Sequence, residues 1–267
     1  MKLHHIYKGD CAEAMRSYIP DGAVDLIYAD PPYNASGKAL DFSRNKTGGP
    51  YAKINEQWDT FSRADYRAFT ECWMRQAMRA LRAGGSLYVS CSMHNIADVI
   101  VHGKAFGADL RNIITWRKSN AMPNITKRTF THSTEYVCWF TKGVKWTYNY
   151  FALKTLNPER SKTGEQKQMP DWVVLPVVQG AERLRGEDRK ALHPTQKPER
   201  LLEIIITASS NPGDVVLDPF MGSGTTAVVA QRLGRQWVGI ERDARFVVAA
   251  LKRLRNENKT GKFKQTA

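Results

Sequence analysis

A strand–turn–helix–strand pattern near the C-terminal end most constrains the fold of this chain. Residues 215–217 are strand formers, and residues 218–226 form a turn with two glycines. A helical segment follows and ends near Gly234, and a second apolar strand, residues 237–240, stops at Glu241. Parallel strands that are joined by a helix are typical of α/β proteins with helices on both faces of the sheet. We therefore predict an α/β fold with a mostly parallel central sheet.

The turn after residue 217 is a candidate ligand site. Glycines at a strand–helix turn let the backbone approach a ligand without a Cβ clash, although a plain tight turn can have the same glycines. Glu241 follows at about the 20-residue distance at which an acidic residue binds ribose hydroxyls. The turn lacks the full GxGxxG pattern of dinucleotide sites. A nucleoside-type ligand such as S-adenosylmethionine is therefore favoured over a pyrophosphate, with a tight turn and a strand-end acid as the alternative.

A second strand ends at a motif that contains two prolines. Residues 24–29 are apolar strand formers, and Asp30 is followed by Pro31 and Pro32, which cannot continue a β-ladder. Asp30 therefore falls at the carboxyl end of a strand, which is where open α/β sheets bind ligands. An ordinary proline turn is the alternative.

Other segments have clear local patterns. Ser62 with Asp65 predicts the start of a helix whose apolar residues recur at intervals of four, and Gly84-Gly85 is expected to end it. Pro198 predicts the start of a later helix. Further strands are predicted at residues 87–91, 113–116 and 136–140.

Three segments lack such periodicity. The stretch at 34–60 is long and polar and contains Lys38, Arg44, Lys46 and Lys53, so we predict a mobile loop. Residues from about 142 to 192 mix basic, proline and aromatic residues. The chain from about residue 256 onward is expected to be a solvated basic tail.

Composition restricts the class of partner. The formal net charge is +14 with a pI near 9.7, which favours a polyanion such as nucleic acid. The chain has no apolar stretch long enough to span a membrane and no apolar N-terminal signal, so a cytoplasmic protein is expected. Four cysteines without a CxxC pair indicate neither a disulfide framework nor a metal site.

Three motifs together resemble those of a known family. Residues 30–33 (DPPY), 220–224 (FMGSG) and 193–198 (HPTQKP) are similar to the catalytic, cofactor and third motifs of DNA amino-methyltransferases. The catalytic motif precedes the cofactor motif, as in the β class, and the chain resembles its small, MboII-type members along nearly its whole length. The resemblance implies one catalytic domain, residues 1–267, with a Rossmann-like methyltransferase fold, circularly permuted motif order and a small target-recognition insert at about 142–192.

The resemblance also implies the site residues. Asp10 and Cys11 are expected near the cofactor adenine, and Thr195 and Lys197 near its methionine end. The expected catalytic residues are Asp30, Pro31, Pro32 and Tyr33. The expected S-adenosylmethionine site comprises Asp10, Cys11, Asp30, Thr195, Lys197, Asp218, Phe220, Gly222, Ser223, Gly224, Thr225, Thr226 and Glu241.

The chemistry of an amino group explains the catalytic motif. An exocyclic amino nitrogen is a poor nucleophile because its lone pair is delocalised into the ring. Asp30 can accept one N–H and the Pro31 carbonyl the other, so that both acceptors are pre-positioned. Tyr33 offers a ring that stacks on the target base, which must first leave the duplex.

Several polar residues are candidates for contact with DNA. By resemblance, residues 116–123 line the target pocket, and Lys118 and Asn120 could contact DNA, or be ordinary residues of an exposed loop. The 142–192 insert suits phosphate contacts with some base contacts, and a solvated charged face is its alternative. The basic candidates there are Arg160, Lys162, Arg183, Arg185 and Arg189.

The leading hypothesis is site-specific methylation of adenine N6 in double-stranded DNA. Cytosine N4 methylation demands similar chemistry, and Asp30 favours adenine because the cytosine group more often has Ser there, by family resemblance. An RNA or protein-glutamine methyltransferase, where Asn often replaces the Asp, and a non-catalytic DNA-binding subunit are further alternatives. Small members of this class often dimerise, but the sequence identifies no interface for a homodimer.

Overall fold

The structure is a computed structural model, and it describes residues 1–34, 61–124, 127–186, 189, 191–192 and 195–259. The predicted mobile loop at 34–60 therefore lies outside the described residues except for Asn34. Asn34 and Phe61, the described residues on either side of this gap, are hydrogen-bonded to each other. The Asn34 side-chain amide donates to the Phe61 carbonyl at 3.1 Å and accepts from the Phe61 N–H at 2.8 Å.

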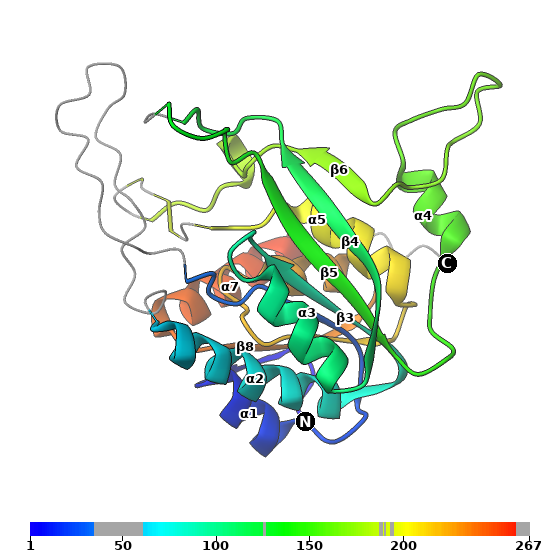
Figure 1. Cartoon of the computed structure of the whole chain (residues 1–267). Helices are drawn as coiled ribbons and strands as arrows, with labels where there is room; N and C mark the ends of the chain where they lie inside the picture. The colour runs from blue at the N-terminus through cyan, green and yellow to red at the C-terminus, as the bar shows by residue number, and fades with distance from the viewer. Residues whose placement is uncertain (35–60, 125–126, 187–188, 190, 193–194, 260–267) are drawn as a thin grey trace.

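The described strands form one eight-stranded sheet in the order β1-β8-β7-β2-β3-β5-β4-β6 (Figure 1). Among them only β5 runs antiparallel to its neighbours. The predicted mostly parallel sheet is therefore confirmed. The strands are β1 (His5–Lys8), β2 (Val24–Ala29), β3 (Leu81–Cys91), β4 (Ala108–Lys118), β5 (Thr134–Lys142), β6 (Trp172–Leu175), β7 (Val215–Asp218) and β8 (Gln236–Glu241).

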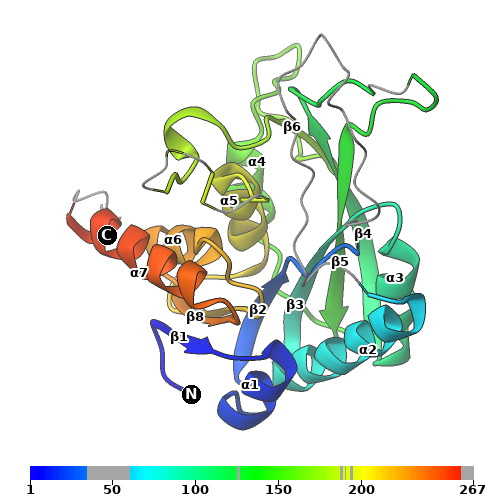
Figure 2. The same ribbon diagram turned by 90° about the vertical axis from the view of Figure 1, so that its left-hand side faces the viewer.

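Helices cover both faces of the sheet, so the fold has three layers (Figures 1 and 2). One face carries α1 (Cys11–Tyr18), α2 (Arg63–Ala80) and α3 (Ile96–Ala105), and the other carries α5 (Glu199–Ser209), α6 (Thr225–Arg232) and α7 (Ala244–Lys259). The short helix α4 (Tyr150–Leu156) packs beside α5.

The central strand β2 shows why both layers are needed. Its residues alternate between the two cores: Leu26 and Tyr28 pack toward α5 and α6, while Ile27 and Ala29 pack toward α1 and α2. All four are at most 2% exposed. Full burial of a large apolar side chain contributes about 1.5–3 kcal/mol, so this strand is stable only when it is covered on both faces.

The sheet brings the two motif-bearing strands together. β2 and β7 are adjacent and parallel, with Leu26 opposite Val216 and Ile27 opposite Leu217. The carboxyl ends of these strands therefore meet at one edge, although the catalytic motif lies near the start of the chain and the cofactor motif near its end. This is the permuted arrangement that the motif order implied.

Most local predictions are confirmed, but one helix end is wrong. Ser62 caps α2, as expected, by accepting from the Asp65 N–H at 3.1 Å. The helix then ends at Ala80, before the glycines, and β3 begins at Leu81. Gly84 and Gly85 lie inside β3, where a Cβ on Gly85 would come within 2.8 Å of the Asp25 carbonyl oxygen. Gly85 therefore serves a close approach between strands, and a Cβ on Gly84 would lie 2.5 Å from the Lys145 carbonyl oxygen, so neither glycine is a helix cap.

Two segments are more ordered than the sequence suggested. Residues 172–175, inside the aperiodic 142–192 stretch, form β6 and extend the main sheet by pairing with β4. The helix α7 continues to Lys259, so the solvated tail does not begin at residue 256. Among the described helices, none is both long enough and apolar enough to cross a membrane.

Candidate active site

The carboxyl edge of the parallel strands gathers the predicted site residues. Asp30 follows β2, Asp218 ends β7, and Glu241 ends β8. Asp10 follows β1, whose last residue, Lys8, pairs with Glu241. Four acidic side chains, each at or just after the end of a different strand, therefore lie along this edge. The order of the strands in the sheet, and not the spacing of these residues in the sequence, determines which of them are neighbours.

Both carboxylate oxygens of Asp30 have partners. Oδ2 accepts from the Lys197 ammonium at 2.7 Å, and Oδ1 accepts from the Tyr33 hydroxyl at 3.0 Å. Burial raises the pKa of Asp30, while the charge of Lys197 acts against that rise. The side chain of Lys197 is only 7% exposed, and its pKa is raised because Asp30 and Glu135 outweigh the effect of burial. Lys197 is thus a fixed cation against the predicted catalytic carboxylate.

The sequence analysis did not identify Glu135, which lies at the start of β5. It pairs with Lys118 of β4 at 2.7 Å and with Lys197 at 3.6 Å, and it accepts from the Tyr33 hydroxyl at 3.1 Å. Lys118, a candidate for DNA contact, is therefore engaged beside the active site, and its contact with DNA stays a prediction. An acidic residue at the start of a buried apolar strand was the available signal.

Tyr33 is positioned from several directions. Its ring lies 5.1 Å from the Lys197 ammonium, in cation–π geometry. The chain around it is held by Tyr66, whose hydroxyl donates to the Pro32 carbonyl at 2.9 Å and accepts from Asn95 at 2.7 Å. The Pro31 carbonyl oxygen of this motif is the one expected to accept an amino hydrogen of the target base.

Two acidic residues, at the ends of β7 and β8, hold the glycine turn through hydrogen bonds. Asp218 accepts from the Thr226 hydroxyl at 2.5 Å and from the Phe220 N–H at 2.9 Å. Burial raises the pKa of Asp218 to about 7. Glu241 accepts from the Gly222 N–H at 2.7 Å, and its other oxygen accepts from the Asp243 N–H at 2.7 Å. Because each carboxylate oxygen has two acceptor sites, Glu241 retains capacity for ribose hydroxyls.

A cavity that is open to solvent lies between the turn and the catalytic motif. Its walls supply carboxylate, hydroxyl and backbone amide groups together with the ring of Phe220, a donor and acceptor set that fits a nucleoside bearing an amino acid. Its lining residues are Tyr28, Asp30, Thr195, Gln196, Lys197, Leu202, Asp218, Phe220, Met221, Gly222, Ser223, Thr225 and Thr226.

Asp10 and Cys11 lie beside this region at the end of β1. The Gly9 N–H donates to the Glu241 carbonyl at 3.0 Å, which ties the two strand ends together. Asp10 caps α1 through its Oδ1, which accepts from Ala12 and Glu13 at 3.0 and 3.1 Å. Cys11 is buried, and burial raises its pKa, as expected of a structural thiol.

Comparison with known proteins assigns the family. A model of a family described as DNA methylase matches residues 24–252. The chain belongs to the DNA methylase family. It is 38% identical to the type II methyltransferase M.HinfI of Haemophilus influenzae, over 95% of this chain and 68% of that protein. It is 40% identical to the type II methyltransferase M2.DpnII of Streptococcus pneumoniae, over 89% of this chain and 85% of that protein.

Solved structures support the same fold for this DNA methylase. A complex of M1.HpyAVI with SAM shares 27% identity and a TM-score of 0.66, covering 94% of this chain and 98% of that one. A cytosine-N4-specific PvuII DNA methyltransferase has a TM-score of 0.69 over 98% of this chain and 94% of that one. At 21% identity, this second similarity concerns the fold alone.

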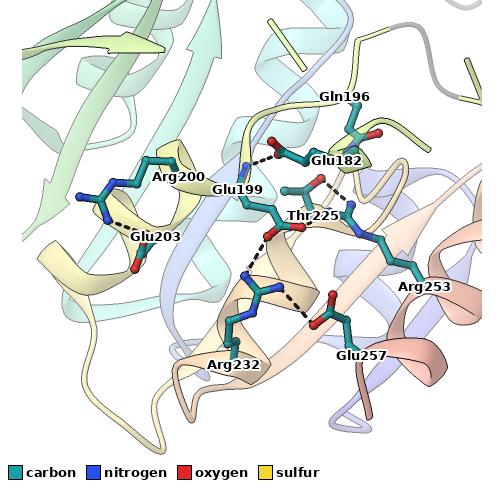
Figure 3. A network of polar contacts seen from close by, with 9 residues as sticks. All are labelled: Glu182, Gln196, Glu199, Arg200, Glu203, Thr225, Arg232, Arg253 and Glu257. Carbon is teal, nitrogen blue, oxygen red and sulfur yellow. Dashed lines mark hydrogen bonds and ion pairs between the residues drawn. The ribbon is translucent and has the colours of Figure 1, made fainter. Parts of the chain in front are cut away.

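A polar network that the sequence analysis missed supports the glycine turn of the methylase (Figure 3). Arg253 of α7, 7% exposed, donates to the Thr225 hydroxyl at 2.9 Å and to the Ser223 carbonyl at 3.3 Å. It also pairs with Glu199 of α5 at 2.6 Å, and Glu199 pairs in turn with Arg232 of α6 at 2.8 Å. The Glu199 carboxylate therefore links α5, α6 and α7, and Arg253 connects this group to the turn.

The same network reaches the third motif. The Glu182 carboxylate accepts from the Glu199 N–H at 2.7 Å and so satisfies an orphan donor at the start of α5. Gln196 donates to the Glu182 carbonyl at 2.8 Å and accepts from the Leu184 N–H at 3.0 Å. Residues 195–197 are therefore held between the cofactor turn and the end of the 142–192 stretch.

Apart from Lys118, the DNA-contact candidates described below have their partners outside this centre. Asn120 is engaged with the backbone of Val177, from which its amide accepts at 2.7 Å and to which it donates at 3.3 Å. Arg160, Arg183 and Arg185 each donate from one guanidinium nitrogen to a nearby backbone carbonyl. Each arginine thus has further donors that can face a phosphate, since a guanidinium carries five.

Within the described part of the chain, His, Cys, Asp and Glu form no group of three that could hold a metal ion.

Proposed function

We propose that this DNA methylase transfers the methyl group of S-adenosylmethionine to the N6 amino group of adenine in double-stranded DNA, at a short specific site. The observation that carries the proposal is the position of Asp30. Its carboxylate lies on one wall of the cavity whose other wall is the glycine turn. An acceptor for an amino group therefore faces the expected cofactor position.

The residues of the chain divide the work of the reaction. S-adenosylmethionine, when bound, supplies an electrophilic methyl group. Asp218, Glu241 and the backbone of residues 220–226 would hold it, with Thr195 and Lys197 toward its methionine end and Asp10 and Cys11 near its adenine. Asp30 and the Pro31 carbonyl would accept the two amino hydrogens and orient the nitrogen lone pair. Tyr33 would stack on the flipped base, so that catalysis is largely positioning.

Asp30 rather than Ser at the first motif position favours adenine over cytosine. Sequencing that detects modified bases, applied to a host that lacks its own methylation and expresses this chain, tests the choice. We expect N6-methyladenine confined to one short sequence. N4-methylcytosine would instead assign the cytosine activity, and the absence of any modified base would refute the proposal.

We infer that residues 142–192 contribute to recognition of the DNA target within a single catalytic domain, residues 1–267. The stretch is rich in basic and aromatic residues, and its exposed side chains include Arg160 and Arg185. For a protein that neutralises DNA phosphates, the logarithm of the affinity decreases linearly with log[salt]. Each phosphate contact contributes about −0.9 to the slope of that line.

Replacement of the insert arginines is expected to weaken DNA binding without loss of cofactor binding. For Arg183→Ala combined with Arg185→Ala, we expect the negative slope of log affinity against log[salt] to become shallower by about 2, or about 0.9 for each lost phosphate contact. Titration of duplex DNA by fluorescence anisotropy at several salt concentrations measures the slope. Arg16→Ala, an exposed arginine of α1, is the matched control. An unchanged slope in the double variant would remove these residues from the DNA interface.

Lys197 is expected to set the acid limb of the pH profile. Transfer requires an ionised Asp30, so the rate rises with pH through the pKa of that carboxyl. Lys197→Met removes the largest charge that opposes the burial-induced rise of this pKa. The acid limb should therefore move to higher pH, by about 1–3 units, the usual effect of an adjacent cation on a carboxyl. Single-turnover rates at saturating cofactor between pH 5 and 9 measure this shift, and an unmoved limb would contradict the assigned role.

A further inference from the structure

The Tyr33 hydroxyl lies between two carboxylates. Its oxygen is 3.0 Å from Asp30 Oδ1 and 3.1 Å from Glu135 Oε2. A phenol carries a single hydrogen and can donate to only one of them at a time. When both carboxylates are ionised, the second contact therefore places two acceptors against each other.

With one additional proton, both contacts of the Tyr33 oxygen can be hydrogen bonds at the same time. If Asp30 holds that proton on Oδ1, it donates to the Tyr33 oxygen, and the Tyr33 hydrogen turns to Glu135. Both oxygen–oxygen contacts then become hydrogen bonds. The geometry thus stabilises the state of Asp30 that exists after it has accepted a proton.

The surrounding charges determine which carboxyl takes the proton. Burial raises the pKa of Asp30, and the negative charge of Glu135 raises it further. Burial also acts to raise the pKa of Glu135, but Lys197 and Lys118 outweigh it and this pKa is lowered. Glu135 therefore stays ionised as an acceptor while Asp30 is protonated. The other titratable side chains that face this pair from surrounding elements are Tyr28, Cys91 and Asp218.

We propose that Glu135 is a positioning residue that receives the Tyr33 hydroxyl when Asp30 takes the proton released during methyl transfer. The proposal rests on the proposed function. The amino nitrogen forms a bond to the methyl carbon, the carbon–sulfur bond breaks, and its electron pair stays on sulfur. The nitrogen then loses one proton to Asp30, which donates it to the Tyr33 oxygen as Tyr33 donates to Glu135. Asp30 returns the proton to water after product leaves, so one proton is released for each methyl group transferred.

A purely structural role for Glu135, as an anchor for Lys118 and Lys197, makes a different prediction. Loss of an anchor would disturb cofactor binding and stability. Loss of the acceptor charge would instead lower the proton affinity of Asp30, and the acid limb of the transfer rate would move to lower pH. This direction is opposite to the one expected for Lys197→Met.

The test uses Glu135→Gln, Tyr33→Phe and the double variant in single-turnover methylation across pH. For Glu135→Gln we expect a plateau rate about tenfold lower, an acid limb at lower pH, and cofactor affinity within about twofold of the parent protein, where tenfold is about 1.4 kcal/mol of lost stabilisation. Because the effect acts through the Tyr33 hydroxyl, Glu135→Gln in the Tyr33→Phe background should slow the plateau no further. Glu71→Gln, a half-exposed carboxylate of α2 that pairs with Arg75, is the control.

Each outcome decides the proposal. A full tenfold effect of Glu135→Gln in the Tyr33→Phe background, or an unchanged rate or acid limb in the single variant, would overturn it. If Glu135→Gln does not fold, Tyr33→Phe alone still tests the proposal, because a plateau rate equal to that of the parent protein would overturn it. A parent protein that binds cofactor but methylates no DNA would refute the proposed function instead.

Discussion

Asp30→Ala is expected to lower the single-turnover rate of DNA methylation by about 10²–10³-fold, the usual cost of removing one preorganised partner of the transition state. The carboxylate is the side-chain acceptor that the catalytic motif offers to the amino group. Lys197 and Tyr33, its present partners at 2.7 and 3.0 Å, have their hydrogens directed at it. Cofactor affinity should change little, because Asp218 and Glu241, which hold the glycine turn, remain intact.

Two variants separate chemistry from folding in this experiment. Asp30→Asn keeps the shape and one acceptor oxygen, so its rate should lie between those of the parent protein and Asp30→Ala. Asp109→Ala removes an exposed aspartate of β4 and serves as the control, with an expected rate near that of the parent protein. Turnover retained by Asp30→Ala within about tenfold would show that another group accepts the amino hydrogen.

Gly224→Ala is expected to weaken S-adenosylmethionine binding by about 10- to 100-fold. Gly224 has φ +80°, and a Cβ there would lie 2.9 Å from the Ala250 Cβ. A non-glycine residue in this conformation costs about 1–3 kcal/mol. If the turn distorts to relieve this strain, the same free energy is lost from cofactor binding, and each 1.4 kcal/mol lowers the affinity about tenfold. Isothermal titration with the cofactor gives the affinity, and thermal unfolding reports the accompanying loss of stability.

The matched control for this substitution is Gly164→Ala. Gly164 has φ +84° but nothing within 4 Å of an added Cβ, so it carries the same backbone strain away from the turn. Its cofactor affinity should equal that of the parent protein. Adding Ala250→Gly to Gly224→Ala removes the steric part of the defect and should restore affinity in part. Unchanged cofactor affinity in Gly224→Ala would show that the turn does not hold the cofactor.

The parts of the site that were predictable from sequence are those that depend on local pattern. The strand before Asp30 and the strand–turn–helix from Val215 to Arg232 follow from residue type and short spacing, and the structure has both. The order of the motifs implied a circularly permuted methyltransferase fold, and the structure adds that β2 and β7 are neighbours. By contrast, β1, α1, α3 and α7 were not predicted, although Asp10 provides an N-cap signal for α1.

The residues that were missed act through contacts between distant segments. Glu135 reaches Tyr33 because β5 lies antiparallel beside β3, and Arg253 reaches Thr225 because α7 packs on α6. Neither contact has a fixed spacing in sequence. Lys118 was interpreted as a surface residue for the same reason, since its partner Glu135 lies on the adjacent strand.

One measurement tests the central claim most directly. The purified protein is incubated with methyl-labelled S-adenosylmethionine and unmethylated double-stranded DNA, the DNA is digested to nucleosides, and the labelled nucleoside is identified by mass. With the parent protein we expect labelled N6-methyldeoxyadenosine, and with Asp30→Ala we expect cofactor binding but labelling of the DNA that is about 10²–10³-fold slower. Label in N4-methyldeoxycytidine, or no label although the cofactor binds tightly, would contradict the assignment.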